Sequence, residues 1–135
     1  VYTQIYISSN GYIQFGTNTP NSFTAQLMPD PSAANNVLAL AWANLLVDPA
    51  TNPGAYVRYF TNGTSPNRRF IIEYNNLRFA GGNGLQNVTG QIRLFENDNH
   101  VEIHATSVNG NGVMLNKVLG MENRLGVIYG YLLQI

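Results

Sequence analysis

Apolar and polar residues alternate with a period of two along most of this chain, which is typical of β-strands with one buried face. The clearest case is the start, where two alternating runs, 2–8 and 12–15, flank the pair Asn10-Gly11. An Asn-Gly pair between two such runs is the strongest short-range signal for a β-hairpin. The sequence therefore predicts a hairpin over residues 2–16.

More strands are expected along the rest of the chain. The run 37–42 is apolar throughout and too short for a typical helix, which favours a strand buried on both faces. It is preceded by residues 17–36, which are rich in Asn, Pro, Ser and Thr and are predicted to form a long connection. The remaining predicted strands are 55–60 paired with 69–77, 90–96 paired with 101–105, and finally 118–122 and 127–135.

About nine short strands without a helical period indicate an all-β fold, an antiparallel two-sheet β-sandwich. A length of 135 residues fits a single domain, 1–135, and no internal repeat divides it. The apolar positions of the strands give a predicted core: Ile5, Ile7, Ile13, Phe15, Leu38, Trp42, Val57, Phe70, Ile72, Ile92, Leu94, Val101 and Ile103.

Charged residues make up only 10% of the chain, and seven basic residues balance seven acidic ones. A nucleic-acid partner is not expected, because the arginines are scattered and form no basic stripe. Asparagine takes the place of charged residues as the main polar residue of the chain. An amide-rich surface of near-zero net charge favours association with other molecules, although asparagine also fills the turns of ordinary all-β proteins.

Two further absences limit the function classes. The chain has no cysteine, so it forms no disulfide and has no thiolate metal site. It also has no apolar run of the roughly 20 residues that would span a bilayer, so no membrane span is expected. Val1 opens directly into a strand pattern, as in a mature or trimmed chain.

The candidate catalytic and metal-binding residues are few. His100 and His104 fall on one face of a predicted strand but about 13 Å apart, too far to share an ion unaided. The carboxylates Glu96, Asp98 and Glu102 cluster at one predicted turn, as solvated turn residues or as an acid/base pair of the glycosidase type. No serine lies in a G-x-S-x-G motif. We expect no enzyme, no cofactor and no metal site.

Two kinds of surface residue remain as candidates. Asn62 and Asn87 begin the N-x-[ST] pattern of N-glycosylation acceptors, and both lie in predicted turns. Tyrosines recur near both ends of the chain, where they contact a second subunit or a ligand, or form cross-strand pairs within a sheet. These are Tyr2, Tyr6, Tyr129 and Tyr131.

Three segments together carry a family resemblance. The first is 6–16, an aromatic and apolar strand that ends in Ser-Asn-Gly. The second is 37–45 with 54–59, an apolar run into a Trp followed by a strand that begins with Gly. The third is 63–76, which leads to a hairpin and to 120–123. The chain thereby resembles extracellular β-sandwich modules of large bacterial surface and secreted proteins, which are similar to the nidogen-type (NIDO-like) domain.

The resemblance implies a non-enzymatic module that takes part in adhesion or matrix assembly, or that forms part of a stalk. Relatives commonly carry Asp after the Trp, where this chain has Ala43 and Asn44, which weakens any calcium site there. Relatives also tend to have an aromatic strand before the first hairpin, and this chain begins after that point.

Two function hypotheses follow, both placing the chain outside the cell or at its surface. In the first, copies associate into a fibre or surface matrix, and strand 1–7 or 127–135 of one copy completes the sheet edge of another. In the second, the chain is an adhesin-type module that binds carbohydrate or matrix protein through loops 18–36 and 81–87.

Overall fold

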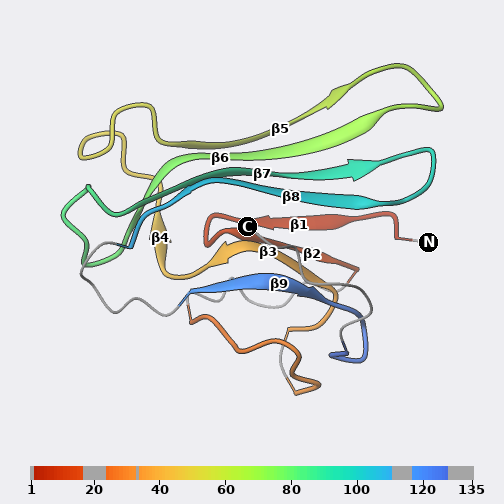
Figure 1. Cartoon of the computed structure of the whole chain (residues 1–135), viewed down its shortest axis with the longest axis horizontal. Coiled ribbons are helices and arrows are strands. Elements are labelled where there is room, and N and C mark those ends of the chain that lie inside the picture. The colour runs from red at the N-terminus through yellow and green to blue at the C-terminus, as the bar shows by residue number, and fades with distance from the viewer. Residues whose placement is uncertain (1, 17–23, 33, 111–116, 128–135) are drawn as a thin grey trace. The chain divides into compact units, whose positions relative to one another are not determined.

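The computed structural model describes residues 2–16, 24–32, 34–110 and 117–127, and these contain nine β-strands and no helix (Figure 1). The strands are β1 Ile5–Ser8, β2 Tyr12–Phe15, β3 Val37–Trp42, β4 Leu45–Leu46, β5 Tyr56–Asn62, β6 Arg69–Phe79, β7 Asn87–Phe95, β8 Val101–Val108 and β9 Val118–Glu122. All pairs are antiparallel, and they form two sheets. The predicted fold class is confirmed, because this is the strand set of an all-β two-sheet sandwich.

Contacts divide the chain into two compact units. The first comprises Val1–Asn44 and Asn116–Ile135, and the second comprises Leu45–Leu115. Each unit contains one of the two sheets. The single domain over 1–135 stays a prediction.

The first unit contains the sheet β1-β2-β3-β9. Its opening hairpin is confirmed, with Ser8 opposite Tyr12 across a three-residue loop that ends in Gly11 at φ 79. A left-handed residue at this position is usual for three-residue hairpin loops and suits glycine. The Gly11 carbonyl accepts hydrogen bonds from the backbone N–H groups of Leu40 and Ala41, so the turn is fixed to the end of β3.

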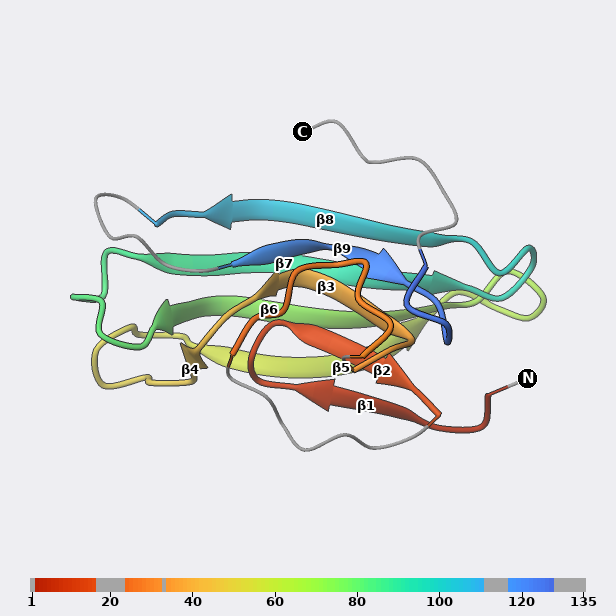
Figure 2. The same ribbon diagram turned by 90° about the horizontal axis from the view of Figure 1, so that it is seen from below.

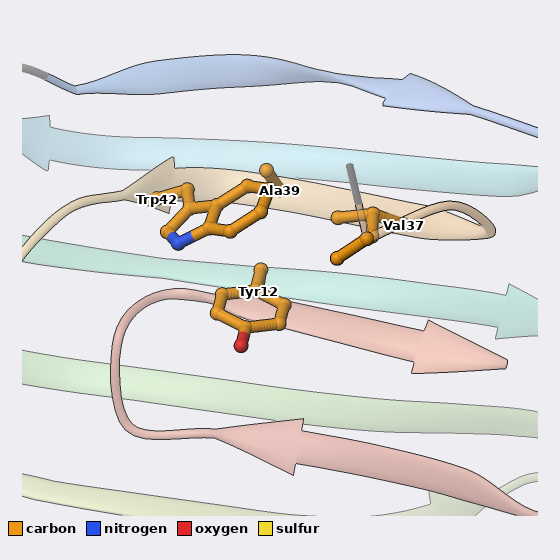
Figure 3. Packing of buried hydrophobic residues seen from close by; sticks show 5 residues of the cluster. Tyr12, Val37, Ala39 and Trp42 are labelled. Carbon is orange, nitrogen blue, oxygen red and sulfur yellow. The ribbon is translucent and has the colours of Figure 1, made fainter. Parts of the chain in front are cut away.

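Residues of β2 and β3, together with Ala34 from the connection before β3, form a buried cluster. Figure 3 shows the ring of Tyr12 facing that of Trp42, and the two ring centroids lie 4.5 Å apart. Ala25 and Met28, from the connection that precedes β3, pack against the cluster. Its buried members are Tyr12, Ala34, Val37, Ala39 and Trp42.

The second unit contains the sheet β4-β6-β7-β8, in which β5 also pairs with β6. Figure 2 shows β6, β7 and β8 running side by side as the longest strands. Opposite residues alternate between an apolar face and a polar face. The apolar face includes the row Ile72, Ile92 and Ile103, and all three side chains are buried.

The predicted core is correct in part. Ile13, Leu38, Trp42, Ile72, Ile92 and Ile103 are buried. The other seven predicted core residues are only partly buried, because they lie at strand ends or on outer strands: Ile5, Ile7, Phe15, Val57, Phe70, Leu94 and Val101. The prediction missed several fully buried side chains, among them Tyr74, Leu77, Phe79 and Val88.

Three of these missed residues, Leu77, Phe79 and Val88, share a cause. β6 and β7 continue past a register shift between Tyr74 and Leu77, where Asn76 adopts φ 51. A bulge of this kind breaks the period of two without ending the strand. Residues 87–89, predicted as a turn, therefore begin β7, and β6 extends to Phe79. The two-residue strand β4 was not predicted, and residues 128–135 of the last predicted strand lie outside the described residues.

Candidate functional site: sheet edges and the outer face

β1 is an outer strand of the first unit's sheet, and among the described residues it pairs with β2 alone. Its four residues include no charged side chain, and neither β2 nor β3 adds one. The first charged residue of the sequence is Asp30. This outer strand therefore lacks the charges by which many proteins keep sheet edges from pairing with other chains.

Tyr2 precedes β1 and Tyr6 lies within it, and the two side chains differ in their contacts. The Tyr2 ring lies 5.5 Å from that of Phe15, and its hydroxyl donates to Asn36 Oδ1 over 3.1 Å. Tyr2 is nonetheless 51% exposed, whereas Tyr6 is partly buried opposite Gln14. Tyr129 and Tyr131 lie outside the described residues.

Two outer strands of the second unit's sheet, β5 and β8, contain charged residues, whereas the two-residue outer strand β4, Leu45–Leu46, contains none. In β5, Arg58 Nε lies 2.6 Å from Glu73 Oε2 of the neighbouring β6. In β8, Glu102 lies beside Arg93 of β7, with 3.7 Å between Oε2 and Nη1. These charges oppose edge-to-edge pairing, so β5 and β8 are better protected than the uncharged β1.

The polar face of the second unit combines charge with aromatic rings. Tyr56, Arg58 and Phe60 alternate onto this face of β5. The Arg58 guanidinium carbon lies 4.7 Å from the centre of the Tyr56 ring and 5.6 Å from that of Phe60, in cation–π geometry. Phe60 is 37% exposed and Arg58 is exposed, so the face offers planar apolar groups beside hydrogen-bond donors.

The three carboxylates near the β7–β8 turn each have a cationic or hydrogen-bonding partner. Hydrogen bonds from the Arg68 side chain lower the pKa of Glu96 to about 2. The pKa of Asp98 is lowered mainly by its hydrogen bond to His100, and that of Glu102 mainly by its hydrogen bond to His104. A glycosidase acid needs a raised pKa, and these three carboxyls are shifted the other way.

The two histidines lie on either side of one carboxylate. His104 Nε2 is 2.6 Å from Glu102 Oε2, and His100 Nε2 is 3.6 Å from Glu102 Oε1. The His100 ring also stacks on Phe95 at 3.8 Å. Over the described ranges, no three His, Cys, Asp or Glu side chains are placed to hold a metal ion.

The two glycosylation acceptors lie in different surroundings, and neither lies within a turn. Asn62 is the exposed last residue of β5, next to a turn that begins at Gly63. Asn87 is the partly buried first residue of β7, and its Oδ1 accepts a hydrogen bond from the Ser107 hydroxyl over 3.2 Å. The prediction that both lie in turns is wrong, because β5 and β7 begin or end at these residues.

Sequence reasoning missed one buried carboxyl. Glu122 ends β9 and is only 5% exposed, and burial raises its pKa. Its Oε2 accepts a hydrogen bond from the backbone N–H of Asp30 over 3.0 Å. The only hint of a buried carboxyl in the sequence is the charged residue at the end of the run 118–122. An exposed strand end would give the same pattern.

Nine antiparallel strands in two sheets make this chain an all-β module. The family model for NIDO-related domains matches residues 1–132, so the chain belongs to the NIDO-related family. The resemblance to nidogen-type modules is thereby confirmed. No curated protein and no solved structure matches the chain.

The family assignment indicates the setting of the chain. NIDO-related domains are typically extracellular, and they point to a structural or matrix-type module. In the part of the chain that the structure describes, no helix is long and apolar enough to cross a membrane.

Proposed function

We propose that this chain is a non-catalytic structural module that associates with copies of itself into a fibre or surface matrix. The association uses the outer edge of β1, where a strand from a second copy adds to the sheet through main-chain hydrogen bonds. The observation that supports this most directly is the contrast between outer strands. β1 and the shorter, two-residue β4 have no charged residue, whereas β5 contains Arg58 and β8 contains Glu102.

The absence of charge matters because a copy meets an identical copy. Like charges on a shared edge repel one another and must be desolvated, and neither cost arises at β1. Low net charge of the whole chain also reduces repulsion between copies. A non-catalytic role fits the lowered pKa values of Glu96, Asp98 and Glu102, which remain ionised and paired.

The test places a charge on the edge. Tyr6→Lys introduces one cation into β1, and Thr106→Lys, at an exposed position of the already charged β8, is the matched control. Sedimentation and electron microscopy at rising concentration should show assemblies for the unchanged chain and for Thr106→Lys, and compact monomers for Tyr6→Lys. The proposal would be refuted if the unchanged chain formed monomers alone, or if all three chains assembled equally.

A second candidate is an adhesin-type module that binds carbohydrate or matrix protein. It is favoured by the exposed face of β5, where Tyr56, Arg58 and Phe60 present rings beside a guanidinium. Aromatic rings stack on sugar rings, and arginine supplies hydrogen bonds. A glycan array and a matrix-protein screen test it, with Phe60→Ala as the variant that should lose binding.

Glycosylation at Asn62 is compatible with either role. Asn62 is exposed next to a surface turn, whereas the Asn87 amide is engaged by Ser107. We therefore propose Asn62 as the modified acceptor in a host that glycosylates. Peptide mapping by mass spectrometry of the secreted chain should place the glycan at Asn62, and Thr64→Ala should remove it.

A further inference from the structure

One buried carboxyl joins two parts of the first unit that are far apart in the sequence. Glu122 at the end of β9 binds the backbone N–H of Asp30 through Oε2, at 3.0 Å. Its other oxygen, Oε1, is buried and has no hydrogen-bond partner among the described residues. A buried carboxylate with an unsatisfied oxygen is costly, and protonation removes most of that cost.

The residues around Asp30 cover the buried cluster of this unit. We call residues 24–32 the strap. Ala25 and Met28 of the strap pack against the cluster that includes Tyr12 and Trp42. Glu122 is the cross-strand partner of Val37, another cluster member, so both side chains project from the same face of the sheet.

Close packing brings the strap against β9 and the turn that follows it. A Cβ added to Gly120 would lie 3.5 Å from Met28 Cε, and one added to Gly126 would lie 2.4 Å from Pro31 Cα. The hydrogen bond from Asp30 to Glu122 lies between these two contacts along the chain. Between the strap and β9 with its following turn, the hydrogen bond to Glu122 is thus a polar interaction among apolar packing contacts.

The carboxylate of Asp30, which lies in the strap, affects the ionisation of Glu122. Burial is the largest cause of the raised pKa of Glu122, and the negative charge of Asp30 raises it further. Asp30 is ionised more easily than usual, because its carboxylate accepts hydrogen bonds from the Ser32 side chain and backbone, which lower its pKa. The other charged residues described in this unit are Lys117, which comes just before β9 in the sequence, and Arg124, which follows it. Both are exposed.

We propose that Glu122 is a proton-operated latch, which holds the strap over the Tyr12–Trp42 cluster when neutral and releases it when ionised. The neutral acid still accepts from Asp30 N–H and carries no charge to desolvate. The ionised form leaves Oε1 unsatisfied and faces the charge of Asp30. Release uncovers apolar surface on the sheet that contains β1, and it does so whether or not copies associate there.

The sign of the pH dependence follows from linkage. The closed state holds the Glu122 proton more tightly than an open state does, because the pKa of Glu122 is raised only when it is buried. Closure is therefore fully favoured below about pH 4.5 and weakens as the pH rises through the raised pKa. Each unit by which the pKa differs between the closed and open states changes the closing equilibrium about tenfold.

Amide hydrogen exchange of the whole chain tests the latch. The reporters are the N–H of Asp30, bound to Glu122, and the N–H of Ala34, bound to Gln26 Oε1. Rates are compared with those of Glu122→Gln at the same pH, from 4.5 to 8, so that intrinsic exchange cancels. We expect equal rates at pH 4.5 and faster exchange of the unchanged chain as the pH rises.

The controls separate the latch from general pH effects. Glu96→Gln, in the second unit, should leave the reporter rates unchanged over this range, and the Asn52 N–H, bound to Asp48 O, should not respond to Glu122→Gln. Asp30→Asn keeps the backbone donor and removes the charge, so the Glu122 titration midpoint, followed by carbon NMR, should fall. A Glu122 midpoint at or below 4.5 in the unchanged chain, or a rate ratio that is constant with pH, would overturn the proposal even if one variant failed to fold.

Discussion

The rings of Tyr12 and Trp42 lie 4.5 Å apart, with an angle of 36° between their planes, in the buried cluster of the first unit. Tyr12 begins β2 and Trp42 ends β3, and a register shift in the pairing of β3 with β9 lies between Ala39 and Trp42. The contact therefore joins the two strands at the end where the opening hairpin turn is bound. Tyr12 and Trp42 are the two aromatic residues among the buried members of this cluster.

Trp42→Ala should lower the free energy of unfolding by about 3–5 kcal/mol, because a fully buried indole is replaced by a cavity. A double-mutant cycle with Tyr12→Ala should give a coupling of about 0.5–1.5 kcal/mol for the ring pair. Urea denaturation measures both quantities. Tyr59→Ala, at a ring that is 66% exposed, is the control and should cost about 1 kcal/mol; equal losses at the two positions would contradict the assignment of Trp42 to the core.

Glu96→Gln should flatten the dependence of stability on pH in acid. Because the pKa of Glu96 in the folded chain is about 2, below the usual 4.5, its stabilisation is present above pH 4.5 and is lost as the pH falls toward 2. Denaturation curves at several pH values in this window measure the effect. Arg68→Gln should produce the same flattening, and adding it to Glu96→Gln should flatten the profile no further, since the two side chains act as one pair.

Gly126→Ala should destabilise the chain more than Gly81→Ala. Both glycines have positive φ, +65° and +78°, which costs an alanine about 1–2 kcal/mol. Only at Gly126 would the new Cβ also meet backbone, 2.4 Å from Pro31 Cα, whereas nothing lies within 4 Å of it at Gly81. Thermal unfolding of the two variants compares them, and equal shifts in midpoint would show that the strap does not pack on Gly126.

Asn52→Ala should cost about 1–3 kcal/mol, because it removes a buried donor from two acceptors. The Asn52 amide donates to Asn76 Oδ1 over 3.0 Å and to the Gly84 carbonyl over 3.1 Å, which ties two loops to the bulge in β6. Asn44→Ala, at an exposed asparagine, should stay within about 0.5 kcal/mol of the unchanged chain. Urea denaturation distinguishes them, and a small loss at Asn52 would mean that water replaces these bonds.

Local pattern was sufficient for much of the fold. The Asn10-Gly11 signal and the turn after Phe95 gave the correct strand pairs, since hairpins are set by neighbouring residues. The apolar run 37–42 gave the correct strand, β3. The prediction of buried positions failed at the bulge of β6, where two residues change the phase of the alternation. Beyond the bulge, Leu77 and Phe79 are buried at positions that a strict period of two assigns to the other face. The pattern also gave no indication of β4, which is too short to have a period.

The sequence by itself determined the class of this protein: an all-β chain of low charge in the NIDO-related family, with an uncharged first strand. Those properties depend on residue type and on spacing over a few positions. Tertiary structure alone decided which ionisable group is buried, because Glu122 is buried where it accepts a hydrogen bond from Asp30, 92 positions away. It also decided the pairing of Arg68 with Glu96, 28 positions away, which sets the pKa of that carboxyl. Long-range contacts of this kind have no local period, and the contact between Glu122 and Asp30 is the one on which the proposed latch depends.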